Sequence, residues 1–194
     1  MTGMAICRMA VMQRITGRIG KNGMQKGSMH MNDRKMVLDG MMGLVIGDAL
    51  GCPVQFLNRE ELRERGAVTE MEGYGTYNMP PGTWTDDSSM ALATLASINE
   101  RNGIDLRDIM ERFLDWEFHG AYTPFGEAFD EGNTCSNAIY KYRDDHDLTT
   151  CGETDEYSNG NGALMRILPV CLYFIQKEDI SDADALRQIH LATG

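Results

Sequence analysis

Two adjacent carboxylates, Asp86 and Asp87, follow the hydroxyl of Thr85 directly before a segment with apolar helical periodicity. One explanation is helix capping, in which Thr85 or Asp86 accepts hydrogen bonds from the first turn and the acids interact favourably with the helix dipole. The other is a site for a hard cation, because Mg²⁺ prefers oxygen ligands and completes its shell with waters or substrate oxygens. Spacing alone favours capping, since a motif this short is weakly specific.

Two further segments combine glycines with polar groups at a predicted helix end. In residues 47–56, small residues flank Asp48, and Pro53 ends the helix just before Gln55. Taken alone, this is a helix terminus with a close packing contact. In residues 158–166, glycines open a helix that carries Arg166. Backbone N–H groups at such a start are able to bind a phosphate and arginine to pair with it, but an ordinary turn explains the same pattern.

The segments that contain these residues have the sequence pattern of helices joined by glycine-rich loops. Apolar residues recur at helical spacing in the region that starts at Met36 and in several later segments, and Pro169 is expected to kink or restart the helix that contains it. The predicted helices after the first are 59–65, 87–100, 106–119, 136–143, 164–175 and a last one around 186–192. The predicted loops are 68–84, 120–135 and 144–162, and the first of these is long enough to suggest a functional role.

No run of alternating β-branched residues stands out, so the sequence predicts an all-α protein. Its length suits one domain with a hydrophobic core, which we place at residues 36–194. Residues 1–35 are rich in Met and in basic residues and lack the apolar core of a secretory signal. We interpret them as a disordered extension or as the product of a misplaced start codon, with a basic targeting segment as the alternative.

Charge and composition exclude several classes of partner. The formal net charge is −11, and because residues 1–36 carry a net positive charge, all the excess acid lies in the rest of the chain. A domain with this excess of acidic residues repels the phosphates of nucleic acid, so a nucleic-acid partner is not expected. No uninterrupted apolar run approaches the roughly 20 residues of a membrane span, so no membrane partner is expected. Five cysteines without zinc spacing indicate reduced thiols and a cytoplasmic location.

The three segments, taken in order on a helical chain, resemble the ADP-ribosylglycohydrolase (DraG-like) family. They read GDALGCPVQF at 47–56, GTWTDDSSMAL at 82–92 and SNGNGALMR at 158–166, and YTPFGEAFDEGNTCSNAI at 122–139 adds to the likeness. The resemblance covers residues 36–175. It implies an orthogonal helical bundle that holds two Mg²⁺ ions and cleaves the glycosidic bond between ADP-ribose and a protein side chain or small acceptor.

The resemblance also implies roles for individual residues. Thr85, Asp86 and Asp87 would bind the metal, and Asp86 and Asp87 would thereby take part in catalysis. Asp130 would face the substrate, and Asp48 would support the metal-site loops rather than bind metal itself. The ADP-ribose pocket would be lined by Gly160, Asn161, Gly162, Ala163, Met165 and Arg166.

Two departures from the family pattern keep other readings open. Gln55 stands where the family frequently has a Glu that assists the reaction, and Gln cannot take a proton near neutral pH. The family also completes its metal site with a Gly-x-Asp-x-Asp-Thr segment, which this sequence lacks, so we expect a chain truncated at the C-terminus. The alternatives are a non-catalytic ADP-ribose-binding or degenerate module, and a helical interaction domain whose acids only cap a helix.

Overall fold

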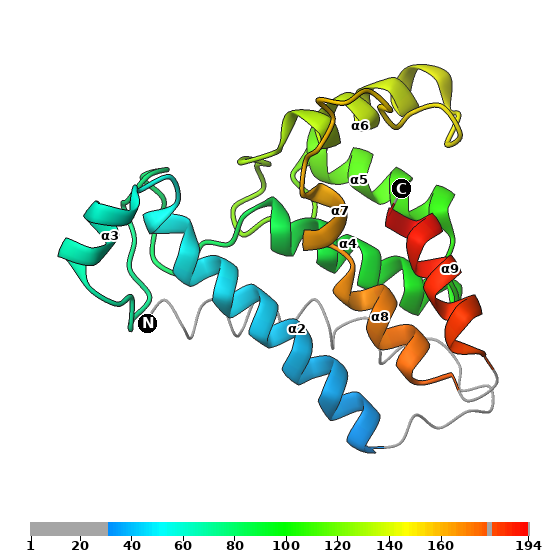
Figure 1. Cartoon of the computed structure of the whole chain (residues 1–194), viewed down its shortest axis with the longest axis horizontal. Coiled ribbons are helices and arrows are strands. Elements are labelled where there is room, and N and C mark those ends of the chain that lie inside the picture. The colour runs from blue at the N-terminus through cyan, green and yellow to red at the C-terminus, as the bar shows by residue number, and fades with distance from the viewer. Residues whose placement is uncertain (1–30, 178–179, 194) are drawn as a thin grey trace.

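The computed structural model describes residues 31–177 and 180–193, and every regular element within these ranges is helical (Figure 1). This confirms the predicted all-α fold. Of the predicted extension 1–35, residues 1–30 lie outside the part of the chain that the structure describes. The elements are α2 (Met31–Gly51), the 3₁₀ turn η1 (Cys52–Val54), α3 (Arg59–Arg65), α4 (Asp86–Arg101), α5 (Leu106–His119), α6 (Asn133–Asp145), α7 (Gly162–Met165), α8 (Leu168–Ile175) and α9 (Asp182–Thr193).

The helix starts differ most from the predicted bounds. The first helix begins at Met31 rather than Met36, because its first turn is polar, with Arg34 and Lys35 exposed, and therefore carries no apolar period. By contrast α3 has the predicted bounds, since Asn58 and Glu61 form a capping box at its start.

Pro169 restarts the last strong helical pattern, as the sequence predicted. The segment is divided into α7 and α8, and Pro169 lies in the first turn of α8. A proline is tolerated there because the first N–H groups of a helix have no partner within it. The short α7 is thereby separate from α8, and it packs against α4, where Met165 lies against the cluster that contains Met90.

Helix α4 lies at the centre of the domain and contacts α2, α5, α7 and α8 (Figure 1). On one side its Ala91 and Leu92 pack with Met41 and Val45 of α2. On the other side Met90 and Ala93 pack against a cluster from α5 and α6, formed by Ile109, Phe113, Trp116, Cys135 and Ile139. Because α4 is shared by both clusters, its N-terminal turn is held in a fixed place.

Helix α2 is the longest of the described elements, and it is more apolar than the absence of an uninterrupted apolar run suggested. The window Arg34–Val54 has a mean hydropathy of 1.5 and is long and apolar enough to cross a membrane by these two criteria. Such a helix near an N-terminus is weak evidence for a span. Met41, Val45 and Ala49 of this helix are fully buried in the protein core, so packing in the bundle accounts for their apolar character.

Candidate metal and ligand site

The N-terminal turn of α4 is capped by a residue from another helix. Thr85 occupies the N-cap position, but its side chain makes no capping bond within α4. Instead the carboxylate of Asp48, on α2, accepts hydrogen bonds from the backbone N–H groups of Thr85 (3.0 Å) and Ser88 (3.1 Å). It also accepts from the hydroxyls of Thr85 (2.9 Å) and Ser88 (2.5 Å). The local capping hypothesis for the Thr85 side chain is therefore wrong.

Because Asp48 caps the helix, the carboxylates of Asp86 and Asp87 are not needed for the N–H groups of Thr85 and Ser88. Asp86 Oδ1 accepts one hydrogen bond, from the N–H of Asp87 at 3.0 Å. Asp87 lines an open pocket. The Thr85 hydroxyl donates to Asp48 and so keeps its lone pairs available. The supporting role that the resemblance implied for Asp48 agrees with these contacts.

The site concentrates negative charge in a poorly solvated place. Asp86 is only 7% exposed, and burial, followed by the charges of Asp87 and Asp130, raises its pKa to about 8. Burial, with the charges of Asp48 and Asp130, raises the pKa of Asp87 to about 6. Within the described part of the chain none of these four acids forms an ion pair with Lys or Arg. A bound cation would relieve this repulsion.

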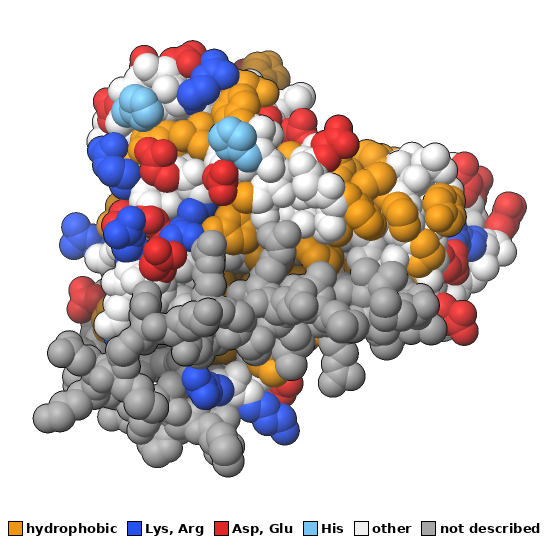
Figure 2. Space-filling model, turned by 180° about the vertical axis from the view of Figure 1, so that it is seen from behind, with side chains coloured by type: hydrophobic (Ala, Val, Ile, Leu, Met, Phe, Trp, Pro, Cys, Tyr) orange, Lys and Arg blue, Asp and Glu red, His pale blue; other side chains and the backbone are white. Residues whose placement is uncertain are grey.

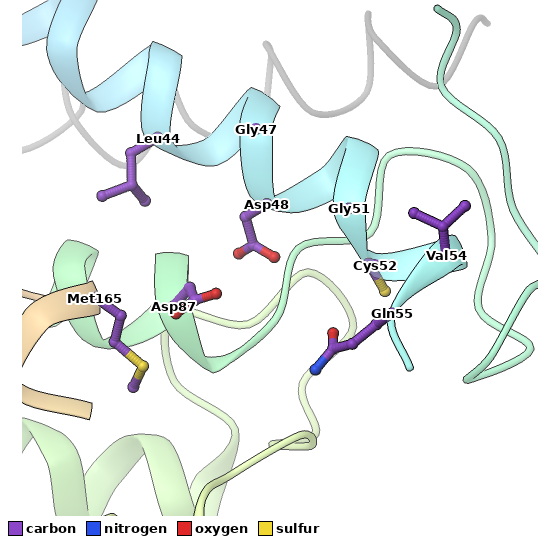
Figure 3. A pocket seen from close by; sticks show the side chains of 9 residues that line it. All are labelled: Leu44, Gly47, Asp48, Gly51, Cys52, Val54, Gln55, Asp87 and Met165. Carbon is purple, nitrogen blue, oxygen red and sulfur yellow. The ribbon is translucent and has the colours of Figure 1, made fainter. Parts of the chain in front are cut away.

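A pocket of about 530 Å³ opens between α2 and the start of α4, a size typical of small-molecule sites. Figure 3 shows Asp48 extending from α2 toward α4, Asp87 at the start of α4, Gln55 just after η1 and Met165 on α7. The remaining lining residues are Leu44, Gly47, Gly51, Cys52 and Val54. The pocket therefore combines residues from all three motif segments of the sequence.

The donor set suits a magnesium ion better than a softer metal. Among the residues that the structure describes, no group of three or more His, Cys, Asp and Glu side chains is arranged to hold a metal. Magnesium commonly uses only one or two carboxylates and fills its shell with waters or phosphate oxygens. Asp86, Asp87 and the Thr85 hydroxyl match that pattern for one ion. A second ion would need ligands beyond these three.

Asp130 reaches the site from a distant loop. It lies between α5 and α6 with a left-handed backbone (φ 66°), and its carboxylate accepts a hydrogen bond from the hydroxyl of Tyr77. Asp130 is close enough to Asp86 and Asp87 for its charge to raise the pKa of both. The structure thus places the predicted substrate-facing acid beside the predicted metal ligands. No pattern in the sequence indicated the contact between Asp130 and Tyr77.

The glycine-rich segment 158–166 is fixed mainly by packing on α6. A Cβ atom on Gly162 would lie 2.0 Å from Cys135 Sγ, so only glycine fits there. The guanidinium of Arg166 lies over the Phe113 ring, with Nη1 3.8 Å from Cys135 Sγ. Of the six residues predicted to line an ADP-ribose pocket, Met165 lines the pocket described above. Phosphate binding by Arg166 and by Gly160, Asn161, Gly162 and Ala163 remains a prediction.

The fold and the site define a helical domain with several carboxylates and a pocket at the start of its central helix. The sequence profile described as ADP-ribosylglycohydrolase matches residues 29–193. The chain therefore belongs to the ADP-ribosylglycohydrolase family.

Several relatives support this assignment. The ADP-ribosylarginine hydrolase Tri1 of Serratia proteamaculans (strain 568) is 36% identical over 69% of this chain and 35% of its own length. The ADP-ribosyl-[dinitrogen reductase] glycohydrolase of Rhodospirillum rubrum is 37% identical over 70% of this chain and 43% of its own. A solved structure titled ADP-ribosylglycohydrolase-related protein complex aligns with a TM-score of 0.61 at 32% identity, over 82% of this chain and 48% of that one. The chain thus spans about a third to a half of the length of these relatives.

Proposed function

We propose that this protein hydrolyses the glycosidic bond that joins ADP-ribose to an arginine side chain of a protein. The family assignment supports cleavage of an ADP-ribosyl linkage, and two relatives are named ADP-ribosylarginine hydrolases. The observation that carries the proposal is the pair Asp86 and Asp87 at the start of α4, where Asp48 caps the helix and Asp87 lines a pocket. We also propose that the protein acts in the cytoplasm on ADP-ribosylated proteins.

Asp86, Asp87 and the hydroxyl of Thr85 are the residues that would hold magnesium. When bound, the ion would orient ribose hydroxyls and lower the pKa of a water molecule. Ionisation of both acids is costly in the metal-free protein because they are buried beside other carboxylates. Their side chains are therefore suited to share a divalent cation.

The remaining groups act on the sugar itself. In hydrolysis the bond from the anomeric carbon to the arginine nitrogen breaks, a water oxygen bonds to that carbon, and a proton passes to the leaving guanidine. The transition state resembles an oxocarbenium ion, so a carboxylate at Asp130 would stabilise it. Asp130 is able to accept a proton, whereas Gln55 is limited to hydrogen bonds at the pocket wall.

The direct test is hydrolysis by the purified chain. ADP-ribosyl-arginine, ADP-ribosyl-serine and O-acetyl-ADP-ribose would each be incubated with magnesium, and free ADP-ribose measured by chromatography. We expect release from the arginine conjugate, and its loss in Asp86→Asn but not in Asp39→Asn, which changes an exposed acid on α2. Absence of release from all three substrates by a folded wild-type chain would refute the proposal for this chain.

A second candidate is a module that binds ADP-ribose without cleaving it, and Gln55 is the observation that favours it. Calorimetry with ADP-ribose, together with the hydrolysis assay, separates the two functions. Binding without hydrolysis by the wild type, and hydrolysis gained in Gln55→Glu, would support the binding module. Hydrolysis by the wild type would exclude it.

A further inference from the structure

Two consecutive residues of the long loop between α3 and α4 connect separate parts of the site. Thr76 donates its backbone N–H to the carbonyl of Pro53 (3.2 Å) and its hydroxyl to the carbonyl of Gln55 (2.5 Å). Tyr77, the next residue, donates its hydroxyl to the carboxylate of Asp130. One short stretch of chain therefore holds the backbone of one candidate residue and the side chain of another.

The residue before this pair allows the close approach. A Cβ atom on Gly75 would lie 1.9 Å from the carbonyl oxygen of Pro53, so any other residue would push the loop away. The contact is between backbone atoms, which cannot move aside as a flexible side chain would. Glycine at this position thus permits the bonds that Thr76 makes.

The ring of Tyr77 is fixed by aromatic neighbours on the two segments that it joins. Phe56, beside Gln55, meets it edge to face at 6.2 Å between ring centroids, and Phe129, beside Asp130, does so at 5.4 Å. Such edge-to-face pairs have a preferred geometry. The hydroxyl is therefore aimed by packing as well as by its hydrogen bond.

Asp130 depends on the Tyr77 hydroxyl for the orientation of its side chain. Its backbone is left-handed, a conformation in which a non-glycine residue is uncommon. The hydrogen bond from Tyr77 joins its carboxylate to a loop 53 residues away in the sequence. Without the Tyr77 hydroxyl the carboxylate would lose this hydrogen bond.

We propose that residues 75–77 form a positioning bridge, in which Tyr77 acts as a positioning residue that holds the Asp130 carboxylate toward the reacting sugar. The inference rests on the proposed function, since it assigns Asp130 a task in that reaction. It adds a dependence of catalysis on a loop hydroxyl that acts through Asp130.

The test compares Tyr77→Phe with Tyr74→Phe, which removes a hydroxyl from an exposed tyrosine of the same loop. We expect Tyr77→Phe to lower kcat about 10- to 100-fold, as misplaced groups do, with KM and the melting temperature unchanged. In an Asp130→Asn background the same change is expected to have little further effect. Equal kcat for the two tyrosine variants, or an undiminished effect in the Asp130→Asn background, would overturn the proposal.

Crystal structures of the wild type and Tyr77→Phe give a readout that does not need activity. We expect the Asp130 carboxylate to be displaced in the variant while the rest of the loop stays in place. An unchanged Asp130 would overturn the bridge. An inactive wild-type chain would count against the proposed function instead, and the bridge would then be judged by the two crystal structures.

Discussion

Replacing Asp48 by alanine is expected to destabilise the protein more than removal of any exposed acid. The substitution removes the acceptor for two backbone N–H groups and two hydroxyls at the start of α4. Thr85 and Ser88 are both buried, with exposed fractions of 2% and 0%. The hydroxyls are able to rotate toward other acceptors, but the N–H groups would remain without a partner in the first turn.

The magnitude follows from these two groups. A buried donor without a partner costs about 1–3 kcal/mol, so two cost roughly 2–6 kcal/mol. Burial raises the pKa of Asp48, which shows that holding its charge has a cost that alanine removes. We therefore expect a net loss in the lower half of that range, about 2–4 kcal/mol. For a chain of this size that corresponds to a fall in melting temperature of roughly 5–15 °C.

Urea unfolding followed by circular dichroism, in the presence of EDTA, would measure the loss without a contribution from bound metal. Asp39→Ala is the matched control, because Asp39 is exposed on the same helix, and it should change stability by less than about 0.5 kcal/mol. If Asp48→Ala cost no more than this control, the assigned capping role of Asp48 would be wrong.

Three further outcomes are expected. Asp86→Asn should abolish the heat of magnesium binding in calorimetry while the circular dichroism spectrum is kept; an unchanged affinity would contradict the ligand assignment. The pKa of Asp86 is about 8 against an ordinary value of 3.8, so the native state binds this proton more tightly than the unfolded state. The free energy of unfolding of the metal-free protein should therefore fall as the pH rises from about 4 to about 8. Asp86→Asn should flatten this slope in urea unfolding, and an equal slope in both proteins would count against it. Gly162→Ala should destabilise by about 1–3 kcal/mol through contact with Cys135, whereas Gly43→Ala, which meets nothing within 4 Å, should stabilise α2 by about 0.5–1 kcal/mol.

The helices were predictable because their signals are local. Apolar residues at helical spacing located α4 and α5, and Pro169 marked the restart at α8. The exposed first turn of α2 was missed because a polar turn has no apolar period. The absence of an uninterrupted apolar run did not reveal that α2 has a high mean hydropathy, because this helix also carries polar residues such as Asp48.

The hydrogen bonds that Asp48 and Asp130 accept could not be predicted from local spacing in the sequence. The bonds from Asp48 to Thr85 and Ser88 span 37 and 40 residues, and the bond from Tyr77 to Asp130 spans 53. Each depends on how helices and loops pack, and no periodicity of a single segment encodes such a contact. A helix-start motif in sequence is therefore compatible with either capping or metal binding.

The helical elements, the loops between them and, through three ordered motifs, the family follow from the sequence. The folded structure is needed to show that Asp48 caps α4, that Asp87 lines a pocket, and that Asp130 lies near Asp86 and Asp87. Helix formation is governed by neighbours along the chain. The charge, burial and hydrogen bonding of a site are governed by groups that meet only when the chain has folded.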